Sequence, residues 1–180
     1  VDPERLGLWG TSGGGAHVPY VTGIDTRVKC AVAQIGHGDG HKIMSSHKTP
    51  AELAKLKADM KADREQRVLT GKSGKLRTID LVTDPGTRGY VLGVAEKDPS
   101  IISYLTYESA EAAFEYRPID VVDRIAPRAL MLIAGEKDEI CPPEQYKEMY
   151  DRITGQKRWL TYPIGHYEMY TPEWIKRSAE

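Results

Sequence analysis

The stretch Gly10–Gly14 (GTSGG) constrains the fold of this chain more than any other part of its sequence. It fits the pattern G-x-S-x-G, in which small residues let the backbone turn sharply between a strand and a helix. A short apolar run over residues 6–9 precedes it, and a helix is predicted after it, over residues 13–23. Such a turn presents the hydroxyl of Ser12 at the end of a sheet, where a base can activate it. The pattern is short enough to occur by chance, so its meaning depends on the rest of the chain.

Three later segments predict further strands of the same sheet. They are residues 28–35 (VKCAVAQI), 129–134 (ALMLIA) and 158–162 (RWLTY). The first two are apolar runs of strand length, which are typical of parallel strands buried on both faces. Helices are predicted over residues 143–153 and from Thr171-Pro172 onwards. Alternating strands and helices predict an α/β fold with a mostly parallel sheet and helices on both faces.

Residues 37–127 interrupt this alternation and are predicted to form a helical insertion. Thr49–Glu52 is a capping box with proline at the first helical position, so a helix is expected from residue 50 into the upper 60s. The expected domains are therefore an α/β core, residues 1–36 and 128–180, and a cap, residues 37–127.

Shorter elements are expected inside this insertion. A strand or extended segment is predicted over residues 76–82, followed by a turn at Asp84–Gly86. Asp98-Pro99 is predicted to begin a short helix that reaches about Leu105, and another helix is expected over residues 107–116.

Chemically active side chains follow three of the predicted strands. Ser12 follows the first strand, Asp138 lies in the turn after residues 129–134, and His166 follows residues 158–162. The carboxyl ends of parallel strands meet at one edge of a sheet, where α/β proteins carry their sites. The three residues occur in the order nucleophile, acid, base that is typical of one large class of serine enzymes.

On these residues the chain resembles the C-terminal part of an α/β-hydrolase, of the dienelactone-hydrolase-like, esterase or thiohydrolase type. The matching segments are DPERLGLWGTSGGG, VVDRIAPRALMLIAGEKDEICPPEQY and YPIGHYEMY. The resemblance implies a partial α/β-hydrolase fold with Ser12 as nucleophile, Asp138 as acid and His166 as base. It also implies that the backbone N–H of Gly13 is the first donor to the oxyanion.

The resemblance implies hydrolysis of a carboxylic ester, thioester or lactone of a small molecule through an acyl-enzyme, with no metal or organic cofactor. Acyltransferases, peptidases and carbon–carbon bond hydrolases use the same three residues, and a non-catalytic hydrolase-like module is a further alternative. The second oxyanion donor of the family comes from a loop before the serine turn, which this sequence does not contain. We therefore expect a missing N-terminal half or a homo-oligomer.

Several residues compete with these assignments. Glu136 and Glu139 lie in the same turn as Asp138, and Asp39 follows an earlier strand. The cluster of His37, Asp39, His41 and His47 has ligand types that suit zinc, but its spacing matches no strong template, so we interpret it as a polar loop. His17 is expected to be a packing residue.

Composition limits the partners of the chain. The net charge is −1, and the 25 Lys and Arg residues are spread along the sequence, which argues against a nucleic-acid or anionic membrane surface. Two cysteines, Cys30 and Cys141, do not make a disulfide framework and indicate a reducing compartment, so the cytoplasm is expected. The first residue is Val1, which leaves an N-terminal targeting signal open.

Overall fold

The computed structural model describes residues 2–81 and 84–179, which form two compact units. One unit contains the residues up to 39 and from 117 onwards, and the other contains residues 40–116. These boundaries lie inside the insertion expected over residues 37–127. Residues 117–127 belong to the first unit because Ile119, Val122 and Ile125 are buried in its core.

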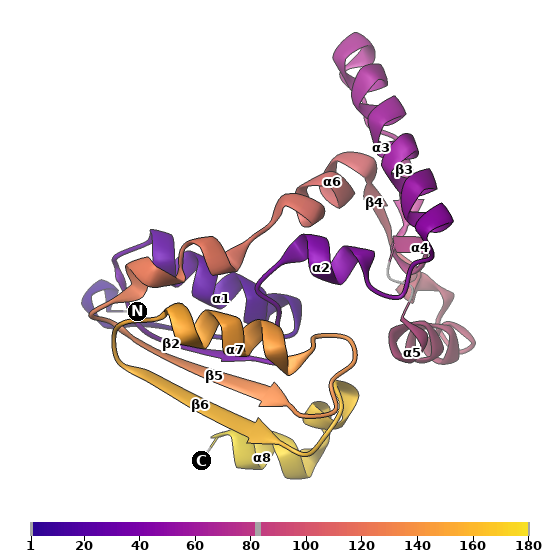
Figure 1. The fold of residues 1–180 in the computed structure, drawn as a ribbon. Coiled ribbons are helices and arrows are strands. Elements are labelled where there is room, and N and C mark those ends of the chain that lie inside the picture. The colour runs from indigo at the N-terminus through magenta and orange to yellow at the C-terminus, as the bar shows by residue number, and fades with distance from the viewer. Residues whose placement is uncertain (1, 82–83, 180) are drawn as a thin grey trace. The chain divides into compact units, whose positions relative to one another are not determined.

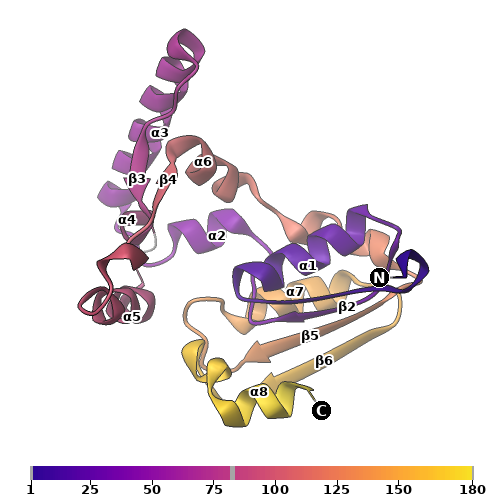
Figure 2. The ribbon, with the colours of Figure 1, turned by 180° about the vertical axis from the view of Figure 1, so that it is seen from behind.

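Four parallel strands form the sheet of the first unit, in the order β1-β2-β5-β6 (Figure 1). They are β1 (Leu6–Thr11), β2 (Val28–Gln34), β5 (Ala129–Gly135) and β6 (Lys157–Tyr162). Helices α1 (Gly13–Ile24) and α7 (Pro143–Arg152) cover one face, and α8 (Pro172–Ala179) lies on the other (Figures 1 and 2). The predicted α/β fold, with a parallel sheet and helices on both faces, is confirmed.

The core of this unit lies mainly between the sheet and helices α1 and α7. Alternate residues of each strand point to this face, and Leu130 and Leu132 are fully buried there. Burial of one such side chain stabilises the fold by about 1.5–3 kcal/mol. A second cluster, which contains Ile133 and Met169, fills the space on the opposite face beside Trp174 of α8.

The second unit is mostly helical and contains one small antiparallel pair of strands. Its elements are α2 (Gly40–Ser45), α3 (Pro50–Thr70), β3 (Lys75–Arg77), α4 (Thr78–Leu81), α5 (Pro85–Ala95), β4 (Tyr104–Thr106) and α6 (Tyr107–Glu115). The predicted capping box begins α3, with reciprocal hydrogen bonds between Thr49 and Glu52. Gly71, in the left-handed conformation at φ 68°, ends that helix.

Parts of this unit differ from the sequence prediction. Asp98 begins only one 3-10 turn, Pro99–Ile101, and the helix expected to reach residue 105 is replaced by β4. The turn expected at residues 84–86 is the start of α5, because the Asp84 carboxylate caps the N–H of Thr87. Helix α2 was not predicted. The strand or extended segment expected over residues 76–82 is extended only to Arg77, because residues 78–81 form the helix α4, and residue 82 lies outside the described residues.

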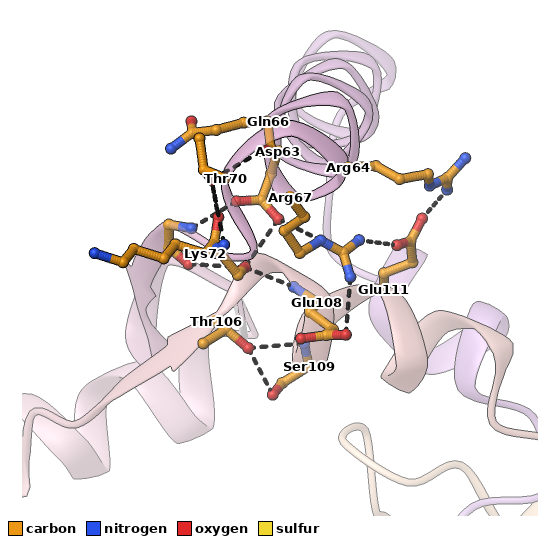
Figure 3. Close-up of polar contacts among 12 residues, drawn as sticks. Asp63, Arg64, Gln66, Arg67, Thr70, Lys72, Thr106, Glu108, Ser109 and Glu111 are labelled. Atoms are coloured by element: carbon orange, nitrogen blue, oxygen red, sulfur yellow. Dashed lines mark hydrogen bonds and ion pairs between the residues drawn. The ribbon is translucent and has the colours of Figure 1, made fainter.

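A network of ion pairs joins α3 to α6 and to the start of β3 (Figure 3). The Arg67 guanidinium lies 3.0 Å from Asp63 Oδ2 and 2.7 Å from Glu111 Oε2. The other oxygen of Asp63 accepts a 2.6 Å hydrogen bond from the N–H of Gly74. Asp63 is buried, so these partners compensate for the loss of water around its charge. Within the described part of the chain, no helix of either unit has the length and hydropathy needed to cross a bilayer.

Candidate active site

Ser12 occupies a strained turn between β1 and α1. Its backbone has φ 55° and ψ −121°, outside the regions that non-glycine residues usually adopt. The N–H of Ser12 donates a 2.9 Å hydrogen bond to the carbonyl of Gln34 at the end of β2. A Cβ atom at Gly10 would lie 2.5 Å from the carbonyl oxygen of Gly14. The turn therefore requires glycine at position 10 and holds the serine at the carboxyl end of the sheet.

The hydroxyl of Ser12 begins a chain of two hydrogen bonds between residues that are far apart in the sequence. Ser12 Oγ lies 2.9 Å from Nε2 of His166, which follows β6. Nδ1 of the same ring lies 2.7 Å from Oδ2 of Asp138, in the turn after β5. The second oxygen of Asp138 accepts hydrogen bonds from the N–H groups of Ile140 and Cys141, at 3.0 and 2.7 Å.

This arrangement determines which ring nitrogen carries the proton. An ionised carboxylate only accepts hydrogen bonds, so Nδ1 of His166 must donate to Asp138. Nε2 of the neutral ring then has a free electron pair, which accepts the hydroxyl proton of Ser12. The side chains of His166 and Asp138 are only 5% and 0% exposed, and water competes little for these bonds. The three residues thus have the geometry of a serine nucleophile with an oriented base.

Comparisons with known proteins support the same architecture. No family model matches the sequence. An "uncharacterized 31.7 kDa protein in traX-finO intergenic region" of Escherichia coli is 28% identical over 181 residues, which cover 99% of this chain and 63% of that protein. The acyltransferase drtE of Aspergillus calidoustus is 23% identical and covers 87% of this chain and 53% of its own length.

Similarity in structure extends over the whole chain. The crystal structure of the α/β-hydrolase GrgF from Penicillium sp. sh18 superposes with a TM-score of 0.74 and 19% identity, and covers 99% of this chain and 63% of its own. The chain has the α/β-hydrolase fold. It spans less than two thirds of the length of these relatives.

In the α/β-hydrolase fold the residue after the serine begins a helix, and here that residue is Gly13. The first N–H groups of a helix have no acceptor within the helix and point away from its end. A Cβ atom at Gly13 would meet nothing within 4 Å, so the space on the side-chain side of its Cα is open. This is the position from which the sequence predicts a first oxyanion donor.

The competing acidic residues have other partners. The carboxylate of Glu136 accepts a 2.7 Å hydrogen bond from the hydroxyl of Thr161. Asp39 is buried and pairs with the guanidinium of Arg117. The hydrogen bonds of His166 thus lead to Asp138 and not to Glu136 or Asp39.

The histidines after β2 do not gather into a metal site within residues 2–81 and 84–179. Burial, together with the nearby His17, lowers the pKa of His37 from 6.5 to about 4, so this imidazole is neutral near pH 7. His41 lies in the second unit, with its ring edge-on to Phe114. His17, which was expected to pack inside, is exposed because its position on α1 faces away from the sheet.

Two aromatic residues beside His166 were not singled out from the sequence. The rings of Tyr167 and Tyr170 lie edge-on to the imidazole, with centroids 5.4 and 6.3 Å away. The hydroxyl of Tyr170 also lies 3.1 Å from that of Thr11, the neighbour of Ser12. The segment YEMY is the sequence signal from which they could have been found. Its two tyrosines lie three residues apart, and in a 3-10 turn such residues share one side.

Proposed function

We propose that the chain carries the catalytic residues of a serine hydrolase that cleaves a carboxylic ester, thioester or lactone. The observation that carries this proposal is the unbroken series of hydrogen bonds from Ser12 through His166 to Asp138. A buried carboxylate that orients a histidine toward a serine hydroxyl is the arrangement that activates serine for acyl transfer.

The reaction proceeds in two balanced steps. His166 removes the hydroxyl proton as Ser12 Oγ attacks the substrate carbonyl. The bond from the acyl carbon to oxygen or sulfur then breaks, and the same proton passes to the departing oxygen or sulfur, which becomes an alcohol or thiol group; in a lactone this group stays part of the acyl chain. Water, activated by His166, next attacks the acyl-enzyme, releases the carboxylic acid and restores the hydroxyl of Ser12. Asp138 stabilises the charged imidazole in both steps, and the Gly13 N–H donates to the oxyanion.

We propose that residues 40–116 are a cap that selects the acyl substrate. They are inserted directly after β2, whose carboxyl end lies next to the serine turn. Insertions at such strand ends determine specificity in many enzymes and move as lids in some. Exchange of residues 40–116 for a short linker should change the substrates that are cleaved while the serine keeps its reactivity.

A second candidate is acyl transfer to an alcohol or amine, which the similarity to an acyltransferase favours. The acyl-enzyme would be the same, and only the acceptor would differ. Product analysis with a 4-nitrophenyl ester in the presence of a small alcohol separates the two. Free acid as the main product supports the hydrolase, and the new ester as the main product supports the transferase.

For the location of the protein we propose the cytoplasm. Neither Cys30, which is exposed, nor Cys141, which is buried, is in a disulfide, as is usual in reducing compartments.

The test of the main proposal is labelling by a fluorophosphonate, which reacts with activated serines. The wild-type chain should be labelled at Ser12, and Ser12→Ala and His166→Ala variants should lose the label. Ser109→Ala, which changes a serine of α6, should keep it. A folded wild-type protein that stays unlabelled would favour the non-catalytic, hydrolase-like module.

A further inference from the structure

Tyr146, on the first turns of α7, makes a hydrogen bond to the serine turn that the reaction steps do not use. Its side chain is 1% exposed, and its hydroxyl donates to the carbonyl of Gly15 at 2.9 Å. The two residues are 131 positions apart in the sequence. Burial raises the pKa of Tyr146 well above its ordinary value, so the hydroxyl keeps its proton.

Proline inside α1 explains why this carbonyl is available. In a regular helix the carbonyl of Gly15 would accept the N–H of residue 19, four positions later. Residue 19 is proline and has no N–H. The helix nevertheless continues to Ile24, and Tyr146 supplies the donor that Pro19 lacks.

The hydroxyl of Tyr146 packs closely against two glycines. A Cβ atom at Gly15 would lie 2.7 Å from the tyrosine oxygen, and one at Gly36 would lie 2.5 Å from it. The backbone of Gly36 thus also lies against the tyrosine oxygen. The hydroxyl therefore fixes two backbone segments, the first turn of α1 and the end of β2, to one point.

Both of these segments are strained. Ser12 has φ 55°, and Ile35, next to Gly36, has φ 43°. Non-glycine residues keep such conformations only when their surroundings enforce them. Tyr146 contacts the chain three residues after Ser12 and one residue after Ile35, so it lies where this restraint is needed.

The residue before Tyr146 acts in the same way on the next loop. Oε1 of Gln145 accepts hydrogen bonds from the N–H groups of Gly38 and Asp39, at 3.2 and 3.0 Å. Gln145 is buried as well. Helix α7 begins at Pro143, five residues after Asp138, so the element that holds both backbone segments lies close in sequence to the turn of the acid.

We propose that Tyr146 is a positioning residue that sets the place of Ser12 relative to His166, with Gln145 holding the adjoining loop. This inference rests on the proposed serine chemistry. Tyr146 touches neither the reacting atoms nor His166, and it acts through the carbonyl of Gly15 and the backbone of Gly36. Its hydroxyl, and not its ring, is the group that matters.

The test compares Tyr146→Phe with Tyr150→Phe on the same helix. Tyr150 makes its contacts through its ring, with Lys157 Nζ 4.3 Å from the centroid, so loss of its hydroxyl is the matched control. Displacement of a reacting group by about 1 Å costs up to about 100-fold in rate. With 4-nitrophenyl acetate, kcat of Tyr146→Phe should fall about tenfold, with KM and the pH profile unchanged. A fall in kcat equal to that of Tyr150→Phe, at equal folded fraction, would overturn the proposal.

Amide hydrogen exchange separates this inference from the proposed function. In Tyr146→Phe the amides of residues 13–16 and 36–38 should exchange faster than in Tyr150→Phe, whether or not the wild-type chain is labelled at Ser12. If the wild-type chain is not labelled by the fluorophosphonate, the proposed serine chemistry is contradicted, but the role of Tyr146 in holding the turn is not. Equal exchange in the two variants would show that Tyr146 does not hold the turn.

Discussion

Nδ1 of His166 lies 2.7 Å from Oδ2 of Asp138, and this buried contact holds the imidazole with its other nitrogen toward Ser12. The carboxylate has a second anchor in the N–H groups of Ile140 and Cys141. The orientation of the imidazole is thus set by a short turn that follows one strand. Substitutions in that turn should therefore lower the reactivity of Ser12.

Replacement of Asp138 by Asn should abolish this orientation without a change of size. The amide can donate to Nδ1, which favours the tautomer with the proton on Nε2, and Ser12 then has no acceptor. We expect the acylation rate to fall by roughly 10³–10⁴-fold. The measurement is the rate of fluorophosphonate labelling. Glu136→Gln in the same turn should label at the wild-type rate, and equal rates for the two variants would assign the acid elsewhere.

Adjacent glycines of α1 should respond to alanine in opposite directions. A Cβ atom at Gly15 would lie 2.4 Å from the carbonyl of Gln34, whereas one at Gly14 would meet nothing within 4 Å. Gly15→Ala should destabilise the fold by about 1–3 kcal/mol through overpacking. Gly14→Ala should stabilise it by about 0.5–1 kcal/mol, since alanine loses less entropy in a helix. Urea unfolding measures both, and a destabilised Gly14→Ala protein would contradict this account.

In the second unit, removal of one buried carboxylate should loosen α3. Asp63→Ala leaves Arg67 and the N–H of Gly74 without their shared partner (Figure 3). We expect a loss of about 3 kcal/mol, typical of a broken buried pair. Asp59→Ala breaks the exposed pair with Lys55 on the same helix and should cost less than about 1 kcal/mol. Limited proteolysis within residues 50–77 reports the difference, and similar cleavage of both variants would count against a role for burial.

The stability of the protein should fall in mild acid because of His37. Its pKa is about 4 in the folded protein and 6.5 as the ordinary value, chiefly because burial disfavours the charged ring. Between these values the unfolded chain binds a proton that the folded chain does not, so the stabilisation is full above pH 6.5 and is lost as the pH falls toward 4. The loss amounts to about 3 kcal/mol, at about 1.4 kcal/mol for each unit of pKa. Urea unfolding against pH should show a smaller slope for His37→Gln than for His41→Gln, and parallel curves would refute the assignment.

The outer edge of β1 should promote association of the 180-residue polypeptide. β1 is an edge strand of the described sheet, and Trp9 on it is 63% exposed. Open strand edges with apolar side chains pair with other chains. Light scattering after size-exclusion chromatography should detect oligomers that Trp9→Ser reduces. Leu69→Ser, on an exposed apolar residue of α3, should leave their proportion unchanged. A monomeric wild-type polypeptide would contradict the prediction.

Local sequence signals were sufficient to predict an element when all the residues that cause it to form lie in one short stretch. The capping box of α3 and the apolar strands have this property, and so does the sequence order of Ser12, Asp138 and His166 at three strand ends. The distances among these three residues depend on the alignment of parallel strands and required the structure.

Prediction from the sequence failed where contacts between distant residues determine the local structure. Helix α5 contains three glycines and gives little helical signal, yet Asp84 begins it with a capping hydrogen bond. Gly15 lies one residue beyond the G-x-S-x-G pattern, and its need for glycine comes from the distant Gln34 and Tyr146. The pairing of Asp39 with Arg117 joins two ends of a long insertion and has no local signature.

The pairing of Asp39 with Arg117 also affects how freely the insertion can vary in length. The N–H of Ile119 donates to the carbonyl of Gly38, and Asp39 pairs with Arg117. The sheet unit itself therefore joins the two points at which residues 40–116 leave it and return to it. Because the two ends of this insertion are already held together, a longer insertion adds only a small entropic cost to folding. Residues 40–116 can therefore change in length or be replaced while the strands of the sheet stay in register.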